Sequence, residues 1–187
     1  MKYTFTQIEK VEDININVFI NGESGISKEL DTRTIHFNSS YRNKKFVDIN
    51  FGAIPEELQE SEFFGHEKGA FTDAESPRIG KLEVADGGTL FLDELAELSP
   101  KAQVKLLRFL QDKSFERVAG NKKIKVDLRI ISATNNDLEK AVANGELPED
   151  LYCRLVVYPI FIPQLWDRNK DIPPLVNHFI KNIGTKF

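Results

Sequence analysis

The sequence is poor in the residues that build disulfides and zinc sites. Its 187 residues include one cysteine, Cys153, and three histidines at positions 36, 66 and 178. A single cysteine cannot form an intrachain disulfide, and the scattered histidines do not match the spacing of a structural zinc site. We therefore expect a protein of a reducing compartment, and the cytoplasm is the default prediction.

A long apolar run and an excess of positive charge are also lacking. No stretch approaches the roughly 20 apolar residues that cross a bilayer, and no signal-peptide pattern opens the chain, so we expect no membrane contact. The net charge is −4, which gives no global signal for nucleic acid. Hydrophobic residues make up 41% of the chain, enough for the core of one domain.

Apolar strand patterns alternate with helical patterns along the chain. Strands are predicted at 14–20, 46–49, 89–92, 128–133 and 156–162. Helices are predicted from Lys28, from Pro55 to Phe64, from Ser99, from Asp137 to Gly145 and over 149–155. This alternation predicts an α/β fold with a doubly wound parallel sheet of five strands, which binds ligands at the carboxyl ends of its strands.

The helical spacing also predicts which side chains are buried. We expect Leu30, Thr34 and Ile35 to face the core from the first helix, and Val104, Leu107 and Leu110 from the helix after Ser99. Residues 65–77 show no periodicity. A loop of that length in a compact domain is usually functional.

The octapeptide at 22–29 lies between the first strand and the following helix. It consists of Gly22, Glu23, Ser24, Gly25, Ile26, Ser27, Lys28 and Glu29. A glycine-rich loop there can wrap backbone N–H groups around phosphate oxygens at a helix N-terminus, with Lys28 reaching the terminal phosphates. The pattern G-x-x-x-x-G-K-[ST] is interrupted at Ser27 and Glu29. Taken alone, the octapeptide is equally compatible with an ordinary glycine–serine turn.

Two adjacent carboxylates, Asp93 and Glu94, follow the apolar strand at 89–92. They would emerge at the ligand end of the sheet, where Asp93 can hold Mg²⁺ through a water and Glu94 can polarise the attacking water. The alternative is a solvated turn. The preceding run at 87–92 favours the hydrolytic site.

Blocks at 53–56, 60–74, 85–94, 115–118 and 150–155 resemble the AAA+ core of sigma-54-dependent transcription activators, the bacterial enhancer-binding proteins. The resemblance runs from about residue 14 to residue 180. It implies a P-loop AAA+ sheet flanked by helices and a ring of identical subunits with ATP and Mg²⁺ between them. It also implies that hydrolysis drives the remodelling of sigma-54 RNA polymerase.

The same resemblance assigns roles to three further residues. Asn50 corresponds to the asparagine that restrains the catalytic glutamate, and Asn135 to a sensor of the terminal phosphate. Arg154 corresponds to an arginine finger that acts on the neighbouring subunit's nucleotide. The respective alternatives are a loop residue that bonds its own backbone, a helix cap and a surface ion pair.

The resemblance places the sigma-factor contact in the long loop. The contact residues would be Gly69, Ala70, Phe71, Thr72, Asp73 and Ala74. Phe71 and Thr72 form the expected tip, and the alternative for Phe71 is a core residue that folds the loop back. Asp73 stands where the family has glycine. Its charge and bulk lead us to expect weakened engagement of the sigma factor.

By the resemblance, residues 1–162 form the AAA+ core and residues 163–187 a linker and the start of the helical lid. By the same resemblance we expect most of the lid to be missing, and we expect neither a sensory module nor a DNA-binding domain in this chain. The leading hypothesis is an ATP-binding and ATP-hydrolysing domain of a sigma-54 activator. The alternatives are a degenerate interaction module, suggested by Ile26, Ser27, Asp73 and Pro148, and an AAA+ remodeller without a sigma partner.

Overall fold

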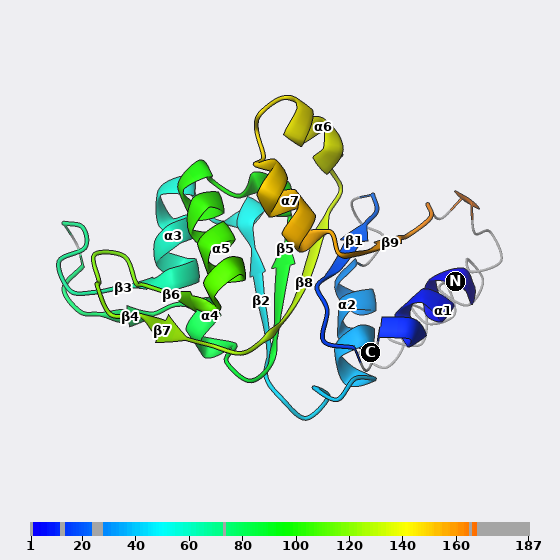
Figure 1. Cartoon of the computed structure of the whole chain (residues 1–187), viewed down its shortest axis with the longest axis horizontal. Helices are drawn as coiled ribbons and strands as arrows, with labels where there is room; N and C mark the ends of the chain where they lie inside the picture. The colour runs from blue at the N-terminus through cyan, green and yellow to red at the C-terminus, as the bar shows by residue number, and fades with distance from the viewer. Residues whose placement is uncertain (1, 12–13, 24–27, 73, 165, 168–187) are drawn as a thin grey trace, which may run out of the picture.

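A parallel β-sheet of five strands lies at the centre of the molecule (Figure 1). The computed structural model describes residues 2–11, 14–23, 28–72, 74–164 and 166–167. The strand order is β2-β5-β8-β1-β9, and every neighbouring pair is parallel. The strands are β1 (Val18–Asn21), β2 (Phe46–Asn50), β5 (Thr89–Asp93), β8 (Arg129–Thr134) and β9 (Tyr158–Phe161). The predicted doubly wound sheet is confirmed.

Seven helices surround the sheet within the described residues. They are α1 (Lys2–Val11), α2 (Lys28–Phe37), α3 (Glu56–Phe64), α4 (Lys81–Val84), α5 (Pro100–Asp112), α6 (Leu138–Ala143) and α7 (Glu149–Leu155). Ser99 and Asp137 cap α5 and α6 by accepting hydrogen bonds from backbone N–H groups in the first turn, as these residue types favour. Two 3₁₀ turns, η1 (Phe51–Ala53) and η2 (Leu95–Glu97), follow β2 and β5.

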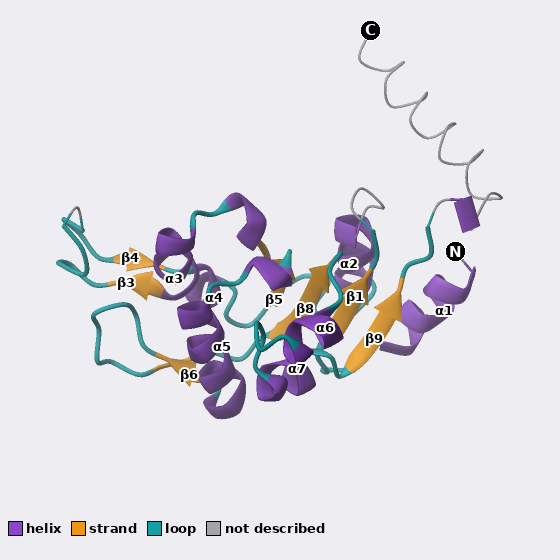
Figure 2. Ribbon diagram, turned by 90° about the horizontal axis from the view of Figure 1, so that it is seen from above, coloured by secondary structure: helices purple, strands orange, loops and turns teal. Residues whose placement is uncertain are grey.

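Both faces of the sheet are covered, because successive strand residues point to opposite sides. Leu90 and Leu92 pack in the core beneath α3, α5 and α7, whereas Phe91 packs in a second core beneath α1 and α2. Figure 2 shows α2 and the α6–α7 pair on opposite sides of β8 and β1. All six residues of β8 are buried, as expected for a central parallel strand.

Two small antiparallel hairpins extend beyond the sheet on the side of α3 and α5 (Figure 1). One joins β3 (Gly65–His66) to β4 (Arg78–Ile79), and the other joins β6 (Ser114–Phe115) to β7 (Ile124–Lys125). The backbones at Gly65 and Gly80 approach so closely that a Cβ at residue 80 would lie 2.3 Å from the nitrogen of Gly65. Only glycine fits there.

The predicted helix positions are confirmed, but parts of the predicted faces are wrong. Leu30 is 62% exposed and Val104 is 48% exposed. The buried stripe of α2 runs instead through Asp31, Thr32 and Ile35, and that of α5 through Ala102, Leu106 and Phe109. The first strand begins at Val18 rather than at residue 14, and α1 was not predicted. Packing against the rest of the fold determines which helix faces are buried and where the strand begins, and the local spacing of apolar residues predicts these features only in part.

The proposed boundary between a core at 1–162 and a lid at 163–187 stays a prediction, because residues 165 and 168–187 lie outside the described part of the chain. Within the described residues, no helix combines the length and the apolar character needed to cross a bilayer.

A histidine is buried where α2 meets the sheet. His36 is 1% exposed, its Nδ1 lies 2.9 Å from the Oγ1 of Thr89, and its ring meets the edge of Phe46 at 5.2 Å. Burial lowers the pKa of His36 below its ordinary value of 6.5, and the nearby charges of Arg129 and Arg33 lower it further.

This burial predicts a pH dependence of stability. The unfolded chain protonates His36 at its ordinary pKa of 6.5, whereas the folded chain resists protonation until lower pH. The stabilisation is therefore complete above that value and is lost as the pH falls toward the lower folded pKa. Between about pH 7.5 and about pH 5.5, the melting temperature should fall more in the wild type than in His36→Gln. Parallel curves for the two proteins would contradict the assignment.

Candidate nucleotide site and partner-binding loop

Four adjacent strands end at one edge of the sheet and bring the predicted site residues together. Asn50 ends β2, Asp93 ends β5, Asn135 follows β8, and the loop that begins at Gly22 follows β1. The backbone N–H of Gly22 donates to the carbonyl of Thr134 at 3.4 Å, which ties the start of this loop to the end of β8. Because the strands are parallel, their carboxyl ends form a common ligand edge.

Lys28 begins α2 and is 7% exposed. Its Nζ donates to the backbone carbonyls of Gly22 at 3.1 Å and Glu23 at 3.4 Å, so its charge lies beside the two residues that directly follow β1. A phosphate group can compete for this ammonium, and α2 presents its N-terminal N–H groups there. Ser24, Gly25, Ile26 and Ser27 lie outside the described residues. Glu29 forms an exposed ion pair with Arg33 at 2.9 Å.

The Asp93 carboxylate is held from two sides. Its Oδ2 accepts from Nδ2 of Asn50 at 3.1 Å, and its Oδ1 accepts from the backbone N–H of Glu94 at 3.0 Å. Asn50 is fixed in turn, because its Oδ1 accepts from the backbone N–H of Ala53 at 3.2 Å. A fixed carboxylate supplies the hard oxygen ligands that Mg²⁺ prefers. Together with the buried Lys28 cation, it fits a magnesium–nucleotide complex.

Glu94 adopts a left-handed backbone conformation, with φ 50° and ψ 52°. Such angles are uncommon for residues other than glycine and cluster at functional sites. They turn the chain sharply from β5 into η2. The resemblance implies that Asn50 restrains Glu94, whereas in this structure the Asn50 side chain donates to Asp93. The asparagine therefore orients the predicted metal-binding carboxylate in this conformation.

The other two predicted residues occupy different positions. Asn135 is exposed directly after β8, beside a cavity of about 440 Å³ that Asn21 and Phe161 also line. Arg154 is exposed in the last turn of α7, and the chain continues from there into β9. β9 is the outermost strand on the side of the sheet opposite to β2. The structure thus brings Asn50, Asp93 and Glu94 together and leaves Arg154 on the surface.

The predicted partner-binding segment forms the turn of the β3–β4 hairpin. The N–H of Gly69 donates to the carbonyl of Ala74 at 2.8 Å, and the N–H of Ala74 donates to that of Phe71 at 3.0 Å. Gly69 has a positive φ of 82°, which the reversal requires. Ala70 is partly buried, Ala74 is buried, and Thr72 is exposed. Asp73 lies outside the described residues.

A buried histidine holds this hairpin. His66 is 6% exposed; its Nε2 lies 3.2 Å from the carbonyl oxygen of Ser76 and its Nδ1 lies 2.7 Å from Oγ of Ser61. Because a carbonyl only accepts, Nε2 carries the proton and Nδ1 accepts from the hydroxyl. The Phe71 ring contacts His66 at 4.9 Å yet remains 41% exposed. Phe71 is thus a surface residue whose ring packs against His66, and not a core residue.

The two hairpins are joined by Arg117, for which the sequence predicts no role. Arg117 donates to both carboxylate oxygens of Glu83, at 3.0 Å and 2.9 Å, and to Glu67 at 3.0 Å. The backbones also meet, since the N–H of Val118 donates to the carbonyl of Gly65 at 2.9 Å. The hydrogen bonds with Glu83 raise the pKa of Arg117. Partners separated by 34 and 50 residues leave no local sequence signal.

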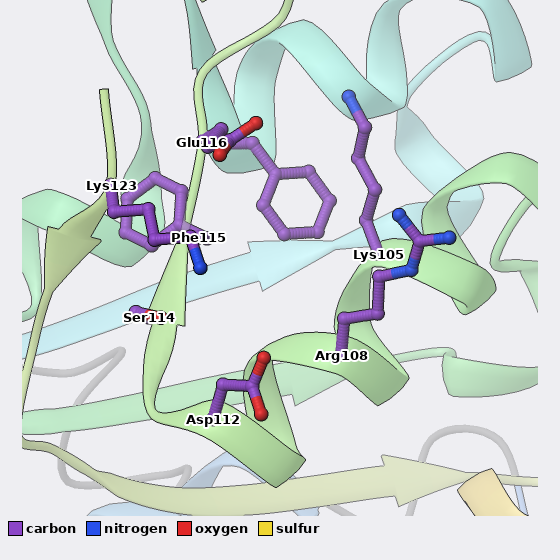
Figure 3. A pocket seen from close by; sticks show the side chains of 8 residues that line it. Lys105, Arg108, Asp112, Ser114, Phe115, Glu116 and Lys123 are labelled. Atoms are coloured by element: carbon purple, nitrogen blue, oxygen red, sulfur yellow. The ribbon is translucent and has the colours of Figure 1, made fainter. Parts of the chain in front are cut away.

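A separate cavity of about 310 Å³ lies between α5 and β6 (Figure 3). The rings of Phe64 and Phe115 line it together with the charged side chains of Lys105, Arg108 and Glu116. Lys105 forms an ion pair with Glu60. The residues of the ligand edge do not line this cavity, so it is no part of the candidate nucleotide site.

Comparison with known proteins identifies a family. Residues 1–161 match the model of the Sigma-54 interaction domain. Nif-specific regulatory proteins are similar: that of Herbaspirillum seropedicae is 51% identical over 97% of this chain, and that of Azotobacter vinelandii 52% identical over 98%. The chain spans about a third of the length of these relatives, 33% and 35%. The crystal structure of NtrX from Brucella abortus in complex with ATP superimposes with a TM-score of 0.91 at 44% identity, over 98% of this chain and 39% of that one.

Replacing the arginine between the hairpins tests its contribution. Arg117→Lys keeps the charge but loses the planar fork that spans two carboxylates, so we expect the free energy of unfolding in urea to fall by about 1–2 kcal/mol. Arg78→Lys is the matched control, because Arg78 makes a two-pronged pair with Glu62 but its side chain is 57% exposed, against 18% for Arg117. The control should lose no more than about 0.5 kcal/mol. Equal losses would show that burial of Arg117 adds nothing.

Proposed function

This chain belongs to the Sigma-54 interaction domain family, and we propose that it binds ATP with Mg²⁺, hydrolyses it, and thereby remodels sigma-54 RNA polymerase in the cytoplasm. The observation that carries the nucleotide proposal is the common edge of four parallel strands. There the buried Lys28 ammonium donates to the carbonyl of Gly22 directly after β1, and the Asp93 carboxylate is fixed at the end of β5. The similar NtrX chain, solved in complex with ATP, supports the same ligand here.

Each residue at this edge has a part in the proposed reaction. Lys28 would exchange its contacts with loop carbonyls for contacts with the terminal phosphates, which offsets their negative charge. Asp93, oriented by Asn50, would hold the metal through a water, and Glu94 would polarise the attacking water. Asn135 would contact the terminal phosphate. Bound Mg²⁺ would supply further charge neutralisation.

Arg154 is proposed to complete the site of a neighbouring copy in a ring. Arg154 is exposed on α7 directly before β9, the outermost strand opposite β2, and this position leaves its side chain free to reach another subunit. An arginine supplied in trans stabilises charge that develops on the transferred phosphoryl group. Residue 148 is proline, where the family often has an earlier arginine, so Arg154 would act as the remaining finger.

The partner of the hairpin loop is proposed to be the sigma-54 factor. Phe71 presents a partly exposed ring at the end of a hairpin that His66 and Arg117 hold in place. A rigidly supported aromatic side chain loses little entropy on binding and is a typical interface anchor. The substitutions at Ile26, Ser27 and Pro148 favour the second candidate, a module that keeps the fold without hydrolysis, and the following experiment separates the two.

The nucleotide proposal predicts different effects for two substitutions. Lys28→Ala should weaken binding of a fluorescent ATP analogue by about 10-fold or more, because it removes a charge-assisted contact. Glu94→Gln should bind within about threefold of the wild type yet lose about 10²–10⁴-fold in phosphate release, because the general base is gone. Lys101→Ala, at an exposed position on α5, is the matched control.

The outcomes of that experiment are distinct. A wild type that binds the analogue but releases no phosphate would establish the non-hydrolysing module. A folded wild type that fails to bind would overturn the proposal of ATP binding and hydrolysis and leave the second candidate, the module that keeps the fold without hydrolysis.

The loop proposal predicts that Phe71→Ala weakens binding to purified sigma-54 by about 10-fold or more, the usual effect of truncating an interface anchor. Phe37→Ala controls for loss of an exposed aromatic ring, since Phe37 is 54% exposed and belongs to α2, which lies well away from the β3–β4 hairpin (Figure 1). Binding can be measured by anisotropy with labelled sigma-54. Equal affinities for Phe71→Ala and wild type would remove the loop from the interface.

A further inference from the structure

A single buried amide joins three segments around the candidate site. Gln59 lies on α3 and is 2% exposed. Its Nε2 donates to the backbone carbonyls of Phe51 at 3.2 Å, Ile54 at 3.4 Å and Glu97 at 2.9 Å. Its Oε1 accepts from the backbone N–H of Ser99 at 2.7 Å. The side chain thus bonds the segment after β2, the segment after β5 and the cap of α5.

These hydrogen bonds are directional, and their loss would destabilise the folded state. Each buried backbone group that loses its partner costs free energy, so the amide fixes the relative positions of the segments that it joins. Phe51 also packs edge to face on Phe63 of α3 at 5.5 Å. That apolar contact would survive removal of the amide but tolerates sliding, because hydrophobic contact has little directionality. The Gln59 amide therefore fixes the position of α3 relative to the segments after β2 and β5, and the contact between Phe51 and Phe63 keeps them packed together.

Gln59 lies between the candidate nucleotide site and the hairpin proposed to bind the partner. On one side, Phe51 directly follows Asn50, and η2, which contains Glu97, directly follows Glu94. On the other side, α3 ends at Phe64 and runs straight into the hairpin whose turn contains Phe71. A cavity of about 310 Å³ borders Gln59 between these segments.

We propose that Gln59 is a positioning residue that makes α3, and with it the Phe71 hairpin, follow movements of the segments beside Asn50 and Glu94. The inference rests on the proposed function, because it assumes that nucleotide binds at this edge. Gln59 is not among the residues proposed to contact the nucleotide or the partner. Its effect is to convert a local displacement at the sheet edge into a displacement of the hairpin.

The test measures nucleotide binding and hairpin movement separately in the full chain. A fluorophore is attached to Thr72→Cys in a Cys153→Ser background, and its emission is recorded as ADP–aluminium fluoride with Mg²⁺ is titrated. Gln59→Met removes the amide at similar volume, and Gln59→Glu keeps an acceptor for Ser99 while removing the donors. Gln103→Met is the matched control, because Gln103 on α5 is also buried and donates to the carbonyls of Leu98 at 2.8 Å and Glu146 at 3.1 Å.

In both Gln59 variants, we expect nucleotide affinity within about threefold of the parent and an emission response reduced about fivefold or more, the low end of typical coupling factors. Gln103→Met should keep the full response despite a similar loss of melting temperature. A full response in a folded Gln59 variant would overturn the proposal, as would equal loss of affinity and response. A parent that binds nucleotide without any response would overturn the coupling alone. A parent that binds no nucleotide would overturn the proposed function beneath it.

Discussion

The hydrogen-bonded ladder of the parallel sheet is the constraint on which the candidate site depends. Residues that are far apart in the sequence become neighbours because β2, β5, β8 and β1 lie side by side in that order. The register pairs Asn50 with Asp93 directly, and it pairs Asn21 with Thr134 one position before Asn135. The two hydrophobic cores on either side of the sheet shield these hydrogen bonds from water. The chemistry at the edge is therefore a consequence of strand order.

Much of this arrangement was predictable from the sequence. Alternating patterns located the strands, and the motif at 22–29 and the pair Asp93–Glu94 each stand where a strand ends. Since the carboxyl ends of parallel strands lie on one side of the sheet, the sequence alone predicts that the motif and the carboxylate pair lie close together. The loop at 65–77 was also predicted to be functional from its length and lack of periodicity.

Other features were not predictable, because they depend on contacts between distant segments. The choice of Asp93 over Glu94 as the partner of Asn50 is set by the backbone of one turn. The ion pair between Arg117 and Glu67 and the backbone bridge between His66 and Val118 arise only when two hairpins lie side by side. The exposed face of α2, including Leu30, reflects which helix packs beside it. Pattern reasoning found the elements and the ligand edge, but it could not find what holds the hairpins.

The left-handed backbone at Glu94 has a consequence for how this chain can change over evolutionary time. Glycine and asparagine adopt such angles more readily than glutamate. Selection for stability alone would thus favour replacing the very residue whose carboxylate is proposed to polarise water. Conformational ease and chemical use conflict at one position, so a lineage released from the need to hydrolyse nucleotide would be free to relieve the strain there. The glutamate in this chain has not been exchanged in that way.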